Sequence, residues 1–245
     1  MPTFNEEANI LACLESVSWA DEVIVVDSFS TDSTVELCRS RGVKLVQHEY
    51  RNSAAQKNWT LPQTRHRWVL IVDADERVTP PLREEIAAVM SGVPGCDGYW
   101  IRRRNRFMGK EIRFCGWQRD KVLRLFDRDK GRYEEKHVHA EVQLNGRVGF
   151  LKSPLVHDSY KDFSAYLRKL DKYTDWGAED LLGKGRRASV LHLLVKPPAR
   201  FVRMYALQLG VLDGVRGLIV CTLGATSVFL KYAKLWRLSA RGGAR

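Results

Sequence analysis

An uninterrupted apolar stretch at residues 68–72 is followed directly by two carboxylates, Asp73 and Asp75. Because the stretch lacks the alternation of apolar and polar positions, it predicts a strand buried on both faces, as in a parallel sheet. A second apolar stretch, residues 23–26, ends in Asp27. Open α/β sheets bind ligands beyond the carboxyl ends of their strands. We therefore expect all three carboxylates to face a ligand.

Helical patterns alternate with these strands along the first 90 residues. We expect helices at residues 10–17, 53–63 and 80–90, and a further short strand at residues 43–47. Strands and helices that alternate about every 20 residues indicate βαβ units. Strands expected beyond residue 98, at residues 99–105, 121–126 and 137–142, are predicted to be antiparallel or mixed. The prediction is an α/β fold with a mixed, mostly parallel sheet flanked by helices.

The C-terminal part has a different pattern. An amphipathic helix is predicted at residues 163–178, a break at Lys196-Pro197-Pro198, and an uncharged stretch of thirteen residues at 218–230. Thirteen residues are fewer than the roughly 20 that a spanning helix needs. We expect a helix in the membrane interface or a shallow hairpin, with a buried helix and a true span as alternatives. The domain prediction is a catalytic domain at 1–160 and a helical, basic, membrane-associating region at 161–245.

The net charge of +11 comes entirely from the C-terminal part. Residues 1–180 carry 28 Lys and Arg and 28 Asp and Glu, whereas residues 181–245 carry 12 basic residues and a single acid, Asp213. Such asymmetry indicates an anionic partner, either a membrane or nucleic acid. Aromatic residues are not interleaved with the basic ones, and no helix-turn-helix or zinc motif is present, so nucleic acid is the weaker hypothesis.

The candidate chemistry is that of a cation-held diphosphate. The sequence contains neither a G-x-G-x-x-G nor a Walker A motif, which disfavours dinucleotide binding and nucleotide hydrolysis. Asp73 and Asp75 each need a positive group nearby, and a divalent cation on a diphosphate would supply it. Alternatively, they pair with Arg77, and Asp27 caps the hydroxyl-rich turn after it. Five scattered cysteines and a polar N-terminus indicate a reduced compartment and no secretory signal.

Four motifs in order carry a resemblance to a known family. They are residues 2–7 (Pro-Thr-Phe-Asn-Glu-Glu), 25–32 (Val-Val-Asp-Ser-Phe-Ser-Thr-Asp), 55–58 (Ala-Gln-Lys-Asn) and 73–75 (Asp-Ala-Asp). The series resembles glycosyltransferase family 2, the inverting nucleotide-sugar enzymes of GT-A fold. Further motifs resemble the lipopolysaccharide-core β-1,4-glucosyltransferases over nearly the whole chain: residues 115–118, 121–126, 138–141 and 231–235.

The resemblance implies a UDP-sugar donor, first of all UDP-glucose, and a divalent cation, Mg²⁺ or Mn²⁺. In that family pattern Asp27 would accept a hydrogen bond from uracil, and Asp73 would contact the ribose or the metal. Asp75 would hold the metal. The remaining donor-site residues implied are Pro2, Thr3 and Glu6 in the nucleotide pocket, and Lys57 and Asn58 beside the donor. The family also has a full apolar strand before the first motif, so we expect a native start upstream of Met1.

Inversion by single displacement requires a general base that takes the proton of the acceptor hydroxyl. The resemblance favours Glu141, with Asp120 second and Glu134 or Glu135 as further candidates. His139 is expected either to orient the base or to pack, and Trp117 either to stack on a sugar or to join the core. The arginine-rich residues 102–106 are expected to meet anionic groups of the acceptor or to be a solvated face.

The expected activity is transfer of glucose to a lipopolysaccharide inner-core heptose. It would take place at the cytoplasmic face of the bacterial inner membrane, to which residues 196–245 would bind peripherally. A polyprenyl-phosphate or exopolysaccharide acceptor is the alternative within the family. A nucleic-acid-binding protein or a catalytically inactive scaffold is the alternative outside it.

Overall fold

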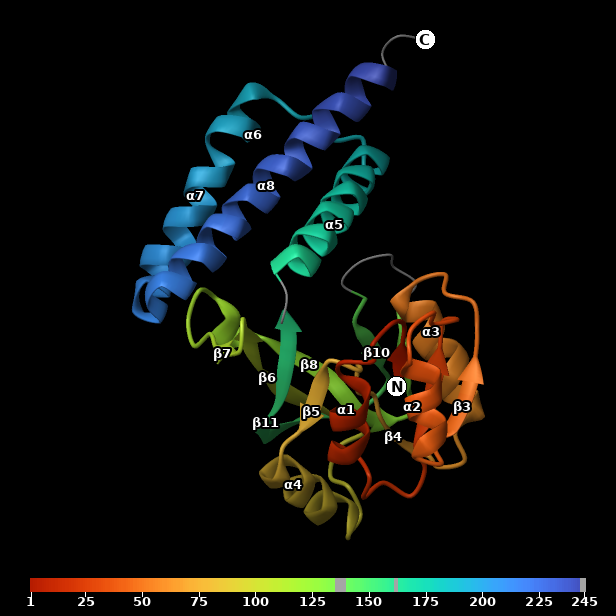
Figure 1. Cartoon of the computed structure of the whole chain (residues 1–245). Helices are drawn as coiled ribbons and strands as arrows, with labels where there is room; N and C mark the ends of the chain where they lie inside the picture. The colour runs from red at the N-terminus through yellow and green to blue at the C-terminus, as the bar shows by residue number, and fades with distance from the viewer. Residues whose placement is uncertain (135–139, 161–162, 243–245) are drawn as a thin grey trace. The chain divides into compact units, whose positions relative to one another are not determined.

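The computed structural model describes residues 1–134, 140–160 and 163–242 (Figure 1). The chain forms two compact units. Unit 1 contains Met1–Arg104 and Asp120–Ser159, and unit 2 contains Asn105–Arg119 and Tyr160–Arg245. Each is described by itself below.

Three short parallel strands of unit 1 bring the carboxyl ends of two motifs together. β1 (Pro2–Thr3), β2 (Ile24–Asp27) and β3 (Lys44–Gln47) lie in the order β1-β2-β3, and Thr3, Asp27 and Gln47 are in register. Every residue of β2 is buried. α1 (Ile10–Ser16) and α2 (Thr34–Ser40) supply Ile10, Leu14 and Cys38 to the apolar cluster around β2.

A second, larger sheet holds the stretch at residues 68–72. Its order is β4 (Trp68–Leu70), β8 (Lys121–Asp127), β6 (Gly98–Phe107), β11 (Val148–Tyr160) and β5 (Glu76–Val78), with β7 (Lys110–Glu111) paired to β6. A separate hairpin pairs β9 (Gly131–Tyr133) with β10 (Val142–Leu144).

The α/β class and the mixed sheet are confirmed, but the prediction of mostly parallel pairing was wrong. Among the described strands the recorded parallel pairs are β1–β2 and β2–β3, and β4 runs antiparallel to β8. Val69, Ile71 and Val72 are buried as the apolar pattern required. An uninterrupted apolar stretch reports burial on both faces, and a covered antiparallel strand meets that condition equally well.

Two helices of unit 1 follow their predicted starts closely. α3 (Ser53–Thr60) continues into a 3₁₀ turn, η1 (Leu61–Gln63). α4 (Pro80–Met90) begins after Thr79, whose hydroxyl accepts a hydrogen bond from the backbone N–H of Leu82 at 3.3 Å. This capping and the proline in the first turn explain the sharp start of the helix.

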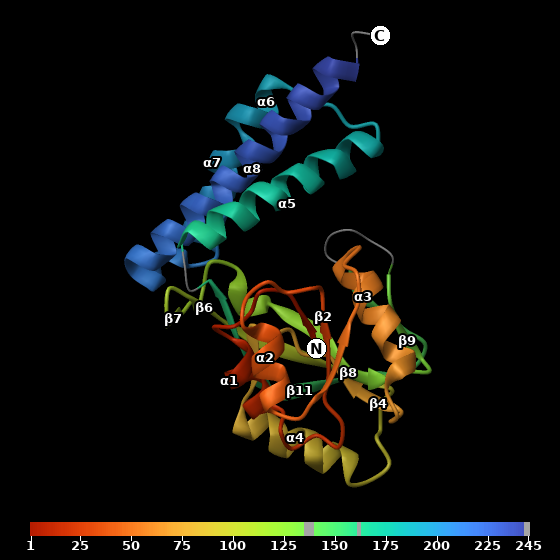
Figure 2. The same ribbon diagram turned by 45° about the vertical axis from the view of Figure 1, so that its right-hand side comes forward.

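Unit 2 is a bundle built around one long helix (Figure 2). α8 (Gly214–Gly242) packs against α5 (Phe163–Gly183) and α7 (Lys196–Val202). In the sequence, α6 (Val190–Leu194) precedes α7, and the π-helical η3 (Arg203–Leu207) and the 3₁₀ turn η4 (Gly210–Asp213) follow it. The prolines expected to break the chain instead occupy the first turn of α7, where a missing N–H costs nothing.

Residues 105–119 belong to the helical unit although they lie in the middle of the chain. The Asp213 carboxylate accepts hydrogen bonds from the backbone N–H groups of Arg113 at 3.1 Å and Phe114 at 2.9 Å. The backbone N–H of Cys115 donates to the carbonyl of Gln208 at 3.1 Å. Asp213, the one acid of residues 181–245, therefore holds this segment against the start of α8.

Candidate functional site

The loops after β1 and β2 are tied to each other by side chains of the two motifs that contain them. The backbone N–H of Asn5 donates to the Ser30 hydroxyl at 2.9 Å, and the Asn5 amide oxygen accepts from the backbone N–H of Thr31 at 2.8 Å. The backbone N–H of Glu6 donates to the Thr34 hydroxyl at 2.8 Å. Asn5 adopts a left-handed backbone conformation, which asparagine tolerates better than most residues. The first two motifs thus form one ordered edge.

Asp27 lies at the base of this edge with its side chain fully buried. One carboxylate oxygen accepts from the Ser30 hydroxyl, and the other accepts from the Ser30 backbone N–H at 2.9 Å and from the Gln47 amide at 3.1 Å. This geometry favours the alternative in which Asp27 caps the hydroxyl-rich turn after it, over a direct hydrogen bond from uracil. Thr3 beside it is also buried, and its hydroxyl has no hydrogen-bond partner among the described residues.

Asp73 is held between two cations. Its carboxylate pairs with the ammonium of Lys57 at 2.9 Å and with the guanidinium of Arg124. Burial alone would raise the pKa of Asp73, but the charges of Arg124 and Lys57 outweigh it and hold that pKa well below its usual range. Arg77, the partner considered from the sequence, instead donates to the backbone carbonyls of Ala74, Glu76 and Asn9.

The pairing continues inward as a chain of alternating charges. Glu76 is fully buried; it accepts from Arg124 at 2.8 Å and from the backbone N–H of Asp73 at 2.9 Å. Arg103 lies 3.4 Å from Glu76 and donates hydrogen bonds to both oxygens of Asp120, at 2.9 and 3.0 Å. The three acids and three bases from Lys57 to Asp120 balance, which is the condition under which buried charges are tolerated.

Asp75 has a different partner, the imidazole of His157 on β11. The His157 Nε2 lies 3.4 Å from an Asp75 oxygen, and the backbone N–H of Asp158 donates to the Asp75 carbonyl at 2.9 Å. In the register of β5 and β11, His157 lies opposite Glu76. A carboxylate and an imidazole side by side are suitable ligands for a divalent cation. No larger cluster of metal-ligating side chains occurs within the described ranges.

Comparison with known proteins decides the family. The model of "Glycosyl transferase family 2" matches residues 1–173. The chain belongs to glycosyl transferase family 2. The match covers the ordered edge at Asn5 and Asp27, the Asp73 cluster and the Asp75–His157 pair. The family assignment and the assignment as an enzyme that were predicted from the motifs are therefore confirmed.

Curated relatives extend the likeness beyond the family domain. The lipopolysaccharide core biosynthesis glycosyltransferase LpsC of Rhizobium meliloti is 30% identical over 96% of this chain and 90% of its own. An uncharacterized glycosyltransferase of Rickettsia typhi is 25% identical over 98% of this chain and 86% of its own. Among solved structures, Staphylococcus aureus TarS residues 1–349 matches with a TM-score of 0.46 at 18% identity, covering 98% and 90% of the two chains.

Two predicted donor-site residues lie on α3 in this family 2 chain, and both are buried. Lys57 pairs with Asp73 and lies over the Tyr133 ring, 5.2 Å from its centre. Asn58 exchanges two 2.9 Å hydrogen bonds with the backbone of Tyr133. Asn58 therefore fixes the β9–β10 hairpin to α3, while Lys57 faces the Asp73 carboxylate.

The same hairpin presents the first candidate base. Glu141 directly precedes β10, it is exposed, and its carbonyl accepts from the backbone N–H of Glu134 at 3.0 Å. Val142 pairs with Tyr133, whose ring contacts Lys57, and Glu141 is the residue next to Val142. Asp120, the second candidate, is held on both oxygens by Arg103. Glu135 and His139 lie outside the described residues.

Other predicted residues lie elsewhere. Trp117 belongs to unit 2, where it packs on the apolar cluster of Phe107 and Met204. Within residues 102–106, the side chains of Arg102 and Arg104 are exposed, whereas Arg103 is half-buried and pairs with Glu76.

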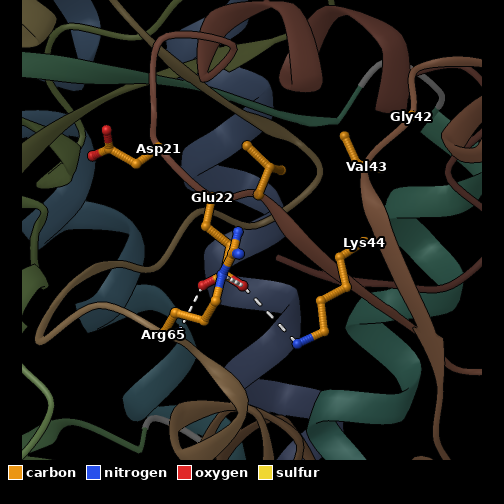
Figure 3. Close-up of a pocket in the computed structure, with 7 residues that line it drawn as sticks. Asp21, Glu22, Gly42, Val43, Lys44 and Arg65 are labelled. Atoms are coloured by element: carbon orange, nitrogen blue, oxygen red, sulfur yellow. Dashed lines mark hydrogen bonds and ion pairs between the residues drawn. The ribbon is translucent and has the colours of Figure 1, made fainter.

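A surface hollow near the amino ends of β2 and β3 does not belong to this site. There Glu22 lies between Arg65 at 3.2 Å and Lys44 at 4.0 Å (Figure 3). Glu22 precedes β2, whereas Asp27 ends it, so the hollow and the candidate site lie at opposite ends of the strand. Ligands of open α/β sheets bind at the carboxyl ends.

Three residues of the site were not found from the sequence: Glu76, Arg124 and His157. Glu76 follows Asp75 directly, but its full burial, which requires a cation nearby, is visible only in the structure. Arg124 sits in an apolar strand, Val-Leu-Arg-Leu-Phe, and an interior arginine there is the complementary signal. His157 is 82 positions from Asp75, and no spacing rule connects them.

Proposed function

We propose that this family 2 enzyme moves glucose from UDP-glucose to a lipopolysaccharide inner-core heptose, with inversion and with help from Mg²⁺ or Mn²⁺. The pairing of Asp75 with His157 beside the neutralised Asp73 carries the donor half of the proposal. The lipopolysaccharide core relative supports the acceptor half.

Asp75 and His157 fit a divalent cation, whereas Asp73 fits it less well because Lys57 and Arg124 already match its charge. Magnesium is commonly held by one or two protein carboxylates together with substrate phosphates, which agrees with a small donor set. When bound, the cation would supply Lewis-acid stabilisation of the departing diphosphate. Asp73 then serves the ribose side of the donor.

Pro2, Thr3 and Glu6 line the nucleotide side in this proposal, on the edge that Asp27 supports from below. The buried Thr3 hydroxyl without a recorded partner is the supporting observation, because buried polar groups normally have one. Lys57 and Asn58 complete the donor side by positioning Asp73 and the β9–β10 hairpin. Their contacts with Asp73 and Tyr133 support positioning roles rather than direct ones.

Glu141 is the proposed general base. Its side chain is exposed at the edge of the hairpin, whereas the alternative base Asp120 already accepts two hydrogen bonds from Arg103. A carboxylate engaged by a guanidinium on both oxygens is a poor proton acceptor. Glu141 would take the proton of the attacking heptose hydroxyl as the bond to the sugar forms.

The acceptor would be lipid-anchored, and the enzyme would work at the cytoplasmic face of the inner membrane with residues 196–245 bound to its anionic surface. The supporting observations are the 12 basic residues against one acid after residue 180 and a helical stretch, Gly210–Ala240, apolar enough to reach into a bilayer. That stretch is weak evidence for a span by itself.

The first prediction tests the donor site. Asp75→Asn should lower the kcat/KM of metal-dependent UDP-glucose turnover by at least about 100-fold, since a cation's stabilisation of the leaving group is worth several kcal/mol. Release of UDP is measured with Mn²⁺ and with excess chelator, using the full chain and core-truncated lipopolysaccharide as acceptor. Asp129→Asn, an exposed carboxylate in the same unit, serves as the matched control and should retain activity.

Turnover with chelator equal to that with Mn²⁺, or an unaffected Asp75→Asn enzyme, would contradict the metal role. Transfer to a polyprenyl phosphate but not to truncated lipopolysaccharide would replace the acceptor. Absence of turnover from a panel of UDP-sugars would refute the donor class.

A further inference from the structure

Residues 190–215 have an unusual surface, which we call the 190–215 segment. It comprises α6, α7, η3, η4 and the first two residues of α8. Every exposed residue in it is apolar, a glycine or proline, or a cation. The exposed large apolar side chains are Val190, Leu191, Leu194, Val195, Val202, Leu207, Leu209, Val211, Leu212 and Val215. Soluble surfaces do not normally gather so many in one short stretch.

The uncharged stretch at 218–230, for which the sequence predicted membrane contact, buries more of its apolar side chains than the 190–215 segment does. Val220, Cys221 and Leu223 are buried in the apolar cluster of the bundle. Its exposed residues are Leu218, Thr222, Thr226 and Phe229, so its outer face is half polar. This stretch mainly supplies the packing between α8 and its neighbours, because its most apolar face is turned inward.

The charges of the 190–215 segment all have one sign at its surface. Lys196, Arg200 and Arg203 are exposed, and the segment's single acid, Asp213, is turned toward the backbone N–H groups of Arg113 and Phe114. Cations beside exposed leucines and valines match an anionic bilayer, whose headgroups attract the cations and whose acyl region takes the apolar side chains.

The backbone at the end of η3 supports a use for the exposed side chains. Leu209 has a φ of 58°, a left-handed conformation that costs free energy for any residue except glycine, and its side chain is exposed nevertheless. Backbone strain of this kind persists chiefly where function requires it. A glycine or asparagine would make the same turn with less strain, but it would remove an apolar contact.

We propose that the 190–215 segment lies in the headgroup region of an anionic bilayer, with α6 and the η3–η4 turn inserting their leucines and valines and α8 acting as the packing helix behind them. The inference rests on the proposed membrane location and specifies which residues make it. It differs from a single span, because the inserted residues come from several short elements in turn.

Flotation with phosphatidylglycerol-containing vesicles tests the proposal on the full chain. The double variant Leu191→Asp/Leu212→Asp changes side chains that are 71% and 63% exposed, so its folding should be preserved. Its partition coefficient should fall at least about tenfold, since each leucine loses the transfer free energy of an apolar side chain. Phe229→Asp, on the outer face of the 218–230 stretch, is the matched control and should change it by less than about threefold.

An unchanged partition coefficient in the double variant, or a larger loss in Phe229→Asp, would overturn the assignment. Equal binding to neutral phosphatidylcholine vesicles would overturn the anionic part of it. If size-exclusion chromatography shows a dimer that the double variant dissociates, with no vesicle binding by either, then a second copy covers the segment. Turnover with a water-soluble acceptor is measured in parallel. Its absence in the unmodified chain would refute the proposed function. Its retention in the double variant would show that the substitutions affect membrane binding and not the transfer reaction.

Discussion

At the scale of single residues, the candidate site contains a row of buried and half-buried charges. Lys57, Asp73, Arg124, Glu76 and Arg103 alternate in sign and end at Asp120. Removing one partner from such a row leaves another charge buried without compensation, which costs far more than the pair contributes when intact.

We predict that Arg124→Met lowers the free energy of unfolding by about 3–5 kcal/mol, because it leaves Glu76 and Asp73 short of a cation. Arg124 has a side chain only 4% exposed. Arg65→Met is the matched control: Arg65 also pairs with a carboxylate, that of Glu22, but its side chain is 75% exposed. The control should lose less than about 1 kcal/mol. Urea unfolding followed by tryptophan fluorescence measures both, and equal losses would contradict the argument.

The sequence predicted the carboxylates of the site better than their partners. The positions of Asp27, Asp73 and Asp75 after strands could be predicted because each follows an apolar stretch, which is a local signal; their roles at a donor site stay predictions. Arg124 and His157 could not be placed in the same way, because their proximity depends on the pairing of β4 with β8 and of β5 with β11. Those pairings join residues 55 or more positions apart, and apolar periodicity carries no information about them.

At the scale of elements, several helices and strands of the first 90 residues were predicted to within a few residues, whereas the partners of the strands were not, and β11 was not predicted at all. α4 has the expected bounds and β3 begins one residue later than expected, because caps and short apolar stretches are local signals. The antiparallel direction of β4 and the extension of α8 back to Gly214 were missed. In the second case a glycine inside the helix is required by packing, because a Cβ at Gly217 would lie 1.9 Å from the carbonyl oxygen of Gly210.

One contact between elements yields a prediction with a pH dependence. Glu85 of α4 accepts the backbone N–H groups of Lys152 at 2.8 Å and Ser153 at 2.9 Å, on β11. Burial would raise the pKa of Glu85, but these two donors outweigh it and lower that pKa. The stabilisation is therefore complete above the unfolded value of about 4.3 and is lost as the pH falls through the lower folded value.

Glu85→Gln should accordingly lower the free energy of unfolding by about 1–3 kcal/mol at pH 7, because a neutral amide cannot accept both hydrogen bonds as well. The difference from the unmodified chain should shrink as the pH is lowered below about 4. Glu84→Gln, the exposed neighbour on the same helix, should stay within about 0.5 kcal/mol. A difference for Glu85→Gln that is constant from pH 7 to pH 3 would refute the role of its charge.

At the scale of the whole molecule, charge is divided between residues 1–180, in which acids and bases balance, and the basic residues 181–245. Deleting residues 196–245 would be a poor test of that division. Such a deletion removes α7 and α8 and uncovers Leu170 and Ala178 of α5, which are buried in the intact chain. The truncated protein would then bind vesicles, or aggregate, through an artificial apolar surface. Charge substitutions and salt avoid this difficulty because they leave the bundle covered.

We predict that binding of the full chain to anionic vesicles has a salt-sensitive and a salt-resistant part. Each cation near an anionic surface contributes about 1 kcal/mol, so Lys196, Arg200 and Arg203 together account for up to roughly 100-fold in affinity at low salt. Raising NaCl from about 0.05 to about 0.5 M shortens the Debye length to a few ångströms and should remove most of that factor. Apolar insertion should persist, since salt does not weaken it.

The triple variant Lys196→Gln/Arg200→Gln/Arg203→Gln should therefore show, already at low salt, the affinity that the unmodified chain has at high salt. The variant Arg39→Gln/Arg41→Gln/Arg51→Gln loses the same charge from exposed positions of unit 1 and should keep the salt dependence of the unmodified chain. Equal losses in the two variants would mean that net charge alone governs binding. A loss of affinity confined to the Lys196/Arg200/Arg203 variant would mean that these cations lie close to the bilayer, beside the inserted leucines and valines. Screened charges act only within about a Debye length of the surface.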